Sequence, residues 1–196
     1  MATAHAVSVP ATSQTGIPTN KLGMWVFLVS EVMFFAGLLA AYIVLRLSHP
    51  AWPGSGGHLS VPLGTANTFV LLCSSMTMVM AHSAVQHDEQ GALRTYLLLT
   101  VLLGAAFLGI KGYEYSVKFE HGINPATNTF WSCYFTLTGF HALHVLGGVI
   151  TNAWFLMRAV QGRLNPKTGY GVELAGLYWH FVDIVWLFVF PLIYLL

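Results

Sequence analysis

Residues 176–196 at the end of the chain read "GLYWHFVDIVWLFVFPLIYLL". The stretch is long and apolar enough for a helix that crosses a bilayer, since about 20 apolar residues span a hydrocarbon core of about 30 Å. Two ionisable residues, His180 and Asp183, nevertheless lie near its middle. Because a charged side chain at the bilayer centre costs about 2.5–3.5 kcal/mol, both are expected to face polar groups inside a protein bundle.

The rest of the chain has the same character. Of its 196 residues, 56% are hydrophobic and only 8% are charged, whereas roughly 25% are charged in ordinary globular proteins. Backbone groups in lipid must be satisfied internally, so the sequence predicts an all-α polytopic membrane protein, a bundle of five transmembrane helices. We expect a flexible segment at 1–20 and a membrane domain at 21–196, with spans at about 22–46, 62–82, 94–114, 130–158 and 172–196.

Charge indicates the orientation and excludes some function classes. With the N-terminus inside, the inner side collects five Lys and Arg residues and the outer side three, which agrees with the positive-inside tendency. We therefore expect a cytoplasmic N-terminus and a C-terminus outside. A net charge of +1 provides no basic surface for nucleic acid, and the first 20 residues lack the basic start of a secretory signal peptide.

Several ionisable residues are predicted to lie at a similar depth in the membrane. By a helix rise of about 1.5 Å per residue, those in the first, fourth and fifth spans fall about 9–16 Å from the inner face. Two interpretations are open for these residues: they hold the helices together through hydrogen bonds, or they bind and release protons. Glu31, among aromatic neighbours, is expected to be buried and to exchange protons, while Glu114 has Lys111 three residues away. The buried polar candidates are Glu31, Glu114, His141, His144, His180 and Asp183.

The histidines raise the question of a haem or metal site. His141 or His144 could pair with His180 as axial haem ligands, but bulky residues surround the fourth-span pair and no group resembles a copper site. We expect no metal, no cofactor and no catalytic residue in this chain. Cationic and aromatic residues near span ends are candidates to meet lipid headgroups: Arg158, Arg163, Lys167 and Trp179.

Long motifs in the chain resemble one known family. They are "LGMWVFLVSEVMFFAGLLAAY", "ANTFVLLCSSMT", "LGAAFLGIKGYEY", "FTLTGFHALHVLGG" and the terminal "GLYWHFVDIVWLFVFPLIYLL". Together they look like subunit III of haem-copper oxidases, in its short five-span bacterial form. The resemblance covers residues 21–196 and keeps the family's order of motifs.

The resemblance implies a role in the bacterial cytoplasmic membrane. Subunit III of these oxidases binds no haem or copper itself and packs on subunit I, in a complex that also contains subunit II. A small subunit IV and a supercomplex with a quinol-oxidising complex are further implied partners. The family's subunit III holds phospholipid and is connected with oxygen supply and proton uptake. Glu31 matches its carbodiimide-reactive carboxylate and Glu114 the carboxylate of its "YEY" motif.

Two departures and several alternatives remain open. Lys111 stands where many mitochondrial-type relatives have Gln, and Arg163–Leu164 stand where they often have His-Phe beside a lipid headgroup. The electron donor of the complex is expected to be cytochrome c. The alternatives are a quinol oxidase subunit, a nitric-oxide-reductase accessory protein, a small proton or ion transporter and a dihaem electron carrier.

Overall fold

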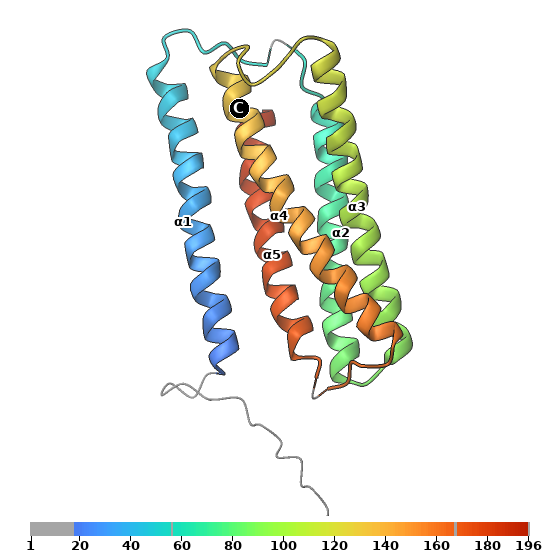
Figure 1. Cartoon of the computed structure of the whole chain (residues 1–196). Helices are drawn as coiled ribbons and strands as arrows, with labels where there is room; N and C mark the ends of the chain where they lie inside the picture. The colour runs from blue at the N-terminus through green and yellow to red at the C-terminus, as the bar shows by residue number, and fades with distance from the viewer. Residues whose placement is uncertain (1–17, 56, 167, 196) are drawn as a thin grey trace, which may run out of the picture.

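The structure, a computed structural model, describes residues 18–55, 57–166 and 168–195. Five long helices follow one another up and down the bundle (Figure 1). They are α1 (Thr19–Ser48), α2 (Val61–Gln86), α3 (Gln90–Glu120), α4 (Thr129–Val160) and α5 (Tyr170–Phe190), which continues as a π-helix, η1 (Pro191–Leu195). The predicted all-α bundle of five membrane-length helices is confirmed.

The helices extend beyond the predicted spans because polar caps and amphipathic ends continue past the apolar cores. The side chain of Ser60 accepts a hydrogen bond from the backbone of Leu63 at the start of α2, and Asn128 accepts one from Trp131 at the start of α4. Such N-caps satisfy backbone N–H groups that have no partner within the helix. Of the segment predicted to be flexible, residues 1–17 lie outside the described residues, and Thr19 and Asn20 belong to α1.

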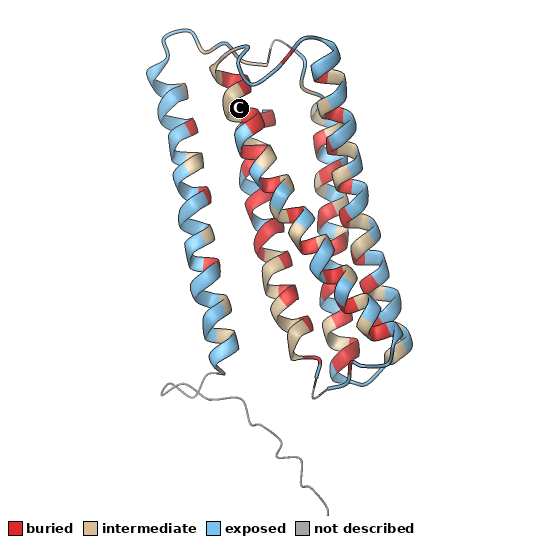
Figure 2. Ribbon diagram, viewed as in Figure 1, coloured by how far each residue is buried: buried red, intermediate tan, exposed pale blue. Residues whose placement is uncertain are grey.

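Helices α2 to α5 pack closely, whereas α1 lies at one side of the bundle against α5 and α4. Figure 2 shows α1 mostly exposed and α5 with the densest run of buried residues. The buried residues of α1 are Leu28, Phe35 and Tyr42. Their spacing of seven residues places them on one narrow stripe of the helix, so α1 touches the rest of the protein along a line.

Two tryptophans of α5 organise the core. Trp179 is fully buried, and its indole N–H donates to the Ser74 hydroxyl of α2 at 3.0 Å. A Cβ atom on Gly148 would lie 2.5 Å from the Trp179 ring, and one on Gly104 would lie 2.7 Å from it. Glycine at these positions therefore makes the room that the indole occupies. The prediction that Trp179 meets a lipid headgroup is wrong, because α2, α3 and α4 enclose it.

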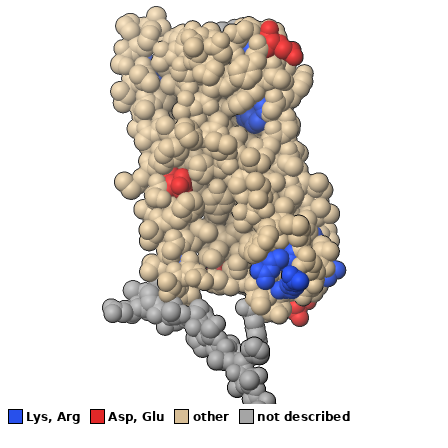
Figure 3. Space-filling view, viewed as in Figure 1, with Lys and Arg blue, Asp and Glu red and all other residues tan. Residues whose placement is uncertain are grey.

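The outer surface suits a bilayer. Large apolar side chains are exposed along every helix, among them Met33, Phe69, Leu143 and Ile184. The face drawn in Figure 3 carries its charged side chains mainly toward the two ends, with broad uncharged surface between them. The end where α1 and α5 begin is called the lower end below, as it appears in Figure 1.

Candidate functional site

A carboxylate and a histidine join α1 to α4. The His144 Nε2 atom lies 3.0 Å from Glu31 Oε2, and both side chains are half-buried, at 18% and 20% exposure. The His144 Nδ1 atom lies 2.7 Å from the backbone oxygen of Phe140, which orients the ring. The pair is a hydrogen bond between a carboxylate and an imidazole whose strength depends on their protonation.

The surroundings of Glu31 differ from those expected. Phe35 is buried and packs edge-on against the His144 ring. Two other aromatic neighbours of Glu31 on α1, Phe27 and Phe34, are 43% and 39% exposed. The prediction of a fully buried Glu31 is therefore corrected to a half-buried one, because α1 contacts the bundle only along its narrow stripe.

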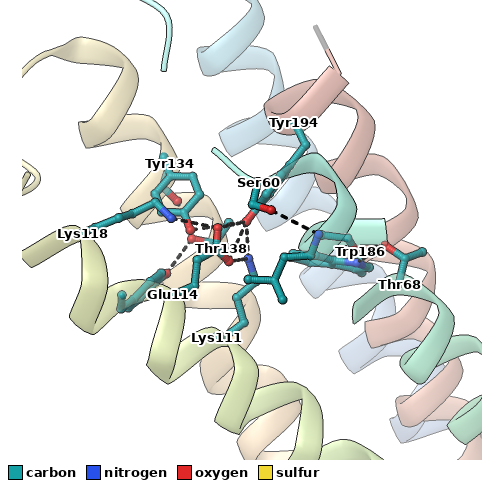
Figure 4. Close-up of polar contacts among 12 residues, drawn as sticks. Ser60, Thr68, Lys111, Glu114, Lys118, Tyr134, Thr138, Trp186 and Tyr194 are labelled. Atoms are coloured by element: carbon teal, nitrogen blue, oxygen red, sulfur yellow. Dashed lines mark hydrogen bonds and ion pairs between the residues drawn. The ribbon is translucent and has the colours of Figure 1, made fainter. Parts of the chain in front are cut away.

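A second cluster is fully buried near the upper end of α3 (Figure 4). Glu114 accepts hydrogen bonds from the ammonium groups of Lys111 at 2.9 Å and Lys118 at 2.8 Å. All three side chains are 5% exposed or less. The Tyr194 hydroxyl of η1 also donates to Glu114, at 2.8 Å. Buried charges require such partners, so this cluster fastens the end of the chain to α3.

Aromatic faces complete this cluster. The Lys111 Nζ atom lies 4.6 Å from the Trp186 ring and also contacts the Tyr194 hydroxyl, and Lys118 Nζ lies 5.0 Å from the Tyr134 ring. Cation–π attraction is strongest where water is excluded. The predicted pairing of Lys111 with Glu114 is confirmed. Lys118 was missed although it follows Glu114 by four residues, a spacing that brings helical side chains together.

Polar contacts also line the seam between α2 and α5. Ser75 Oγ lies 2.6 Å from His180 Nδ1, and the indole of Trp186 donates to Thr68 at 2.9 Å. Asp183, at 4% exposure, faces this seam, and neither carboxyl oxygen has a hydrogen-bond partner among the described residues. Both polar residues predicted in the terminal motif, His180 and Asp183, thus face protein groups at this seam, as a bundle with a polar interior requires.

His141 is the most enclosed of the predicted histidines. Its ring packs against Trp186 and Phe107, and neither nitrogen has a hydrogen-bond partner among the described residues. Of the predicted polar set, only Glu31 and His144 touch one another directly. Among the described residues, no three His, Cys, Asp or Glu side chains gather closely enough to hold a metal ion.

An apolar cleft separates α1 from α5. Its volume is about 550 Å³, and residues from both helices line it, including Trp25, Val29, Phe35, Ala36, Phe181 and Ile184. His180 is the polar residue of its wall. A second groove of about 380 Å³ lies among α1, α4 and α5 and is lined by Phe27, Phe155 and Tyr178. Clefts of this composition suit flexible hydrocarbon.

Two of the remaining lipid-headgroup candidates, Arg158 and Arg163, lie near the lower end. The Arg158 guanidinium lies 4.9 Å from the ring of Trp154, which is 47% exposed. Arg163 is exposed in the loop between α4 and α5. Lys167 lies outside the described residues. An exposed indole beside a guanidinium is typical of a membrane interface.

Comparisons with known proteins identify the family. The family model described as cytochrome c oxidase subunit III matches residues 5–196. A cytochrome c oxidase subunit 3 of Thermostichus vulcanus is 38% identical over 89% of this chain and 86% of its own length. The corresponding protein of Synechocystis sp. is 39% identical over 90% of this chain and 76% of its own. A probable quinol oxidase subunit 3 of Staphylococcus epidermidis is 34% identical over 90% and 89%.

The family-model match runs through all five helices and both polar clusters, and the matches together confirm the resemblance seen in the motifs. The chain belongs to the cytochrome c oxidase subunit III family, the third subunits of haem-copper oxidases.

Proposed function

We propose that this chain is the non-redox subunit III of a proton-pumping cytochrome c oxidase in a bacterial cytoplasmic membrane. It stabilises subunit I, lies in a complex with subunit II, holds phospholipid and supports oxygen supply and proton uptake. The observation that carries this proposal is the match of residues 5–196 to the family model, which leaves no helix of the bundle unassigned. Haem and copper belong to the partner subunits.

The exposed apolar surface supports the proposed association with partner subunits. Apolar residues cover the outside of all five helices, and apolar helices associate in lipid through close packing. The proposed topology places the N-terminus in the cytoplasm, since Lys21, Arg94, Arg158 and Arg163 gather at the lower end.

The cleft between α1 and α5 supports lipid binding. It opens between two membrane-length helices and has an almost wholly apolar lining, so an acyl chain is its natural occupant. A path of the same kind also suits oxygen, which is apolar and dissolves better in hydrocarbon than in water. Arg158 beside Trp154 is the proposed contact for an anionic headgroup.

The Glu31–His144 contact supports the proposed role of this chain in proton uptake. The two groups join α1 to α4 at a predicted depth inside the membrane, and a carboxyl group and an imidazole in contact can pass a proton between them. Their half-burial leaves them accessible to a partner subunit or to water along the α1 groove.

The test is purification of the tagged chain from its own host's membranes. We expect subunits with haem and copper to copurify, with the absorbance of reduced haem in stoichiometric amount. Isolation of the chain alone under mild detergent would contradict the proposal. Oxygen consumption with reduced cytochrome c, measured against a quinol, then assigns the donor.

A quinol oxidase is the second candidate. It is supported by the Staphylococcus epidermidis relative, whose name states that function and which matches over nearly the same length as the cytochrome c oxidase relatives. Turnover with quinol and none with cytochrome c would establish it. The subunit III assignment holds in either case.

A further inference from the structure

The carboxyl group of Asp183 is buried and has no charged partner among the described residues. It lies in the membrane-spanning part of α5 at 4% exposure. No described residue forms an ion pair with it, and neither carboxyl oxygen has a donor in good hydrogen-bond geometry, although the Ser75 hydroxyl lies next to it. An unpaired carboxylate at this depth would be costly. A neutral acid hydrogen-bonded to water would avoid this cost, because water commonly occupies buried polar positions in proteins.

A line of polar side chains leads from the lower end of the bundle toward Asp183. Ser75 of α2 is the hydroxyl that faces the carboxyl group, and it also contacts His180 Nδ1 at 2.6 Å. His82 follows Ser75 by seven residues, so it lies on the same face of α2 and about 10 Å nearer the lower end. Its ring interacts electrostatically with His180.

The lower end of this line reaches the surface. The His82 Nε2 atom lies 2.9 Å from the amide nitrogen of Gln86, which is exposed at the end of α2. The His82 Nδ1 atom is buried and has no hydrogen-bond partner among the described residues. Unsatisfied atoms thus stand on both sides of the contact between Ser75 and His180, and water bound at each would join the line into one chain.

We propose that Asp183 is a proton-binding site, loaded from the lower end of the bundle through His82, His180 and Ser75. Each transfer breaks one N–H or O–H bond and forms the next, so one proton arriving at His82 appears as the acid proton of Asp183. No electron moves. The site lies outside the Glu31–His144 pair and adds a second proton-exchanging group to the proposed function without depending on the electron donor.

Other ionisable groups near α5 are already engaged or shielded. On α1 and α4, Glu31 and His144 contact each other. On α4, aromatic rings enclose His141. On α3, Lys111 contacts Glu114 and Tyr194. Among the described residues, none of these groups forms an ion pair with Asp183. The polar side chains that lead to Asp183 therefore come from α2.

Infrared difference spectroscopy tests this site in the full chain, within the complex with which it purifies or in lipid nanodiscs. The Asp183→Asn variant should lose one C=O band of a protonated carboxyl group. After transfer to D₂O, Ser75→Ala and His82→Phe should keep that band but slow its isotope shift about tenfold or more, about 1.4 kcal/mol of barrier. His87→Phe is the matched control, because His87 is exposed at the same end of α2, and it should exchange at the unchanged rate.

Two results would overturn the inference. A spectrum of Asp183→Asn that retains every carboxyl band would show that Asp183 holds no proton. Isotope exchange at the original rate in both Ser75→Ala and His82→Phe would show that the α2 line does not serve it. If Asp183→Asn does not accumulate, these two variants decide the matter, and the nanodisc measurement keeps the result separate from failure of the oxidase assignment.

Discussion

Helices α1 and α5 have similar compositions but different places in the protein. In an apolar 18-residue window of each span, 17% of the residues are buried in α1 and 50% in α5 with η1. The window of α1 nevertheless has the higher mean hydropathy. High hydropathy of the membrane-spanning window thus does not bring high burial inside the protein (Figure 2). In lipid, hydrophobicity decides whether a helix crosses the membrane but not which neighbours it has, since acyl chains are as apolar as leucine.

Different contacts hold these two helices. Trp179 of α5 enters space left by Gly148 and Gly104 and donates to a serine of α2. Helix α1 is held by its narrow stripe and by separate polar contacts along its length. These are Lys21–Glu173 at 2.5 Å, Glu31–His144 at 3.0 Å and Tyr42 to the backbone oxygen of Leu192 at 3.0 Å. The core formed by α2 to α5 should therefore be sensitive to mutation and α1 tolerant.

The largest effect is expected at Glu114. Replacing it by Gln leaves Lys111 and Lys118 buried without a carboxylate, which costs about 3–5 kcal/mol when one partner of a buried pair is removed. Thermal unfolding followed by tryptophan fluorescence should show a large loss of stability or no accumulation. Glu120→Gln, exposed on the same helix, is the control and should unfold as the original chain does. Equal stability of the two variants would contradict the role of this cluster.

A smaller loss is expected at Gly148. The added methyl group of Gly148→Ala would meet the Trp179 ring, and overpacking of this kind costs about 1–3 kcal/mol. The same measurement applied to Gly37→Ala should show no loss, because a Cβ there meets nothing within 4 Å. Similar destabilisation by both changes would remove the distinction between the core and α1.

The Glu31→Gln change should cost less than about 1 kcal/mol, because an amide keeps a hydrogen bond to His144 across a half-buried contact. Assembly and initial oxygen reduction should persist. Carbodiimide labelling at this position should be lost, since it needs the acid, and proton pumping or turnover lifetime should fall. Immediate loss of oxygen reduction in a fully assembled complex would show that Glu31 is more than an accessory group.

The smallest effect is expected for the Lys21–Glu173 pair. Both side chains are partly exposed, at 34% and 27%, and such pairs contribute about 0–1 kcal/mol. Lys21→Met and Glu173→Gln should each shift unfolding slightly, and the double variant should add little to either. A double-mutant coupling well above 1 kcal/mol would mean that α1 is fixed more firmly than its burial indicates.

Sequence predicted the five spans because lipid requires long apolar helices, and it predicted the Lys111–Glu114 pair because both members lie on one helix. It did not predict which helices pack together. Trp179 lies near the start of its span, where interfacial tryptophans are common. It is buried because glycines on α3 and α4 leave space for its ring, and this packing between helices cannot be read from the sequence of α5. Tyr194 lies 80 residues from Glu114, and no spacing rule connects them.

Glu31 and His144 illustrate the intermediate case. Sequence placed both at a similar depth, from the helix rise and the thickness of the membrane. Their contact required the further fact that α1 faces α4 with this side. Phe27 and Phe34 are exposed for the same reason. The sequence does not show which side of α1 faces the bundle, and an aromatic residue on a membrane helix contacts lipid as readily as protein.

Lipid retention tests most directly the claim that α1 flanks a lipid-filled cleft beside a tightly packed core. Native mass spectrometry of the purified complex would compare Ala36→Trp, which places an indole in the lining of the cleft, with Gly37→Trp, which adds the same side chain one residue away on an open part of α1. The account predicts that Ala36→Trp loses a bound phospholipid that the original chain and Gly37→Trp both retain. Equal phospholipid content in all three proteins would contradict it.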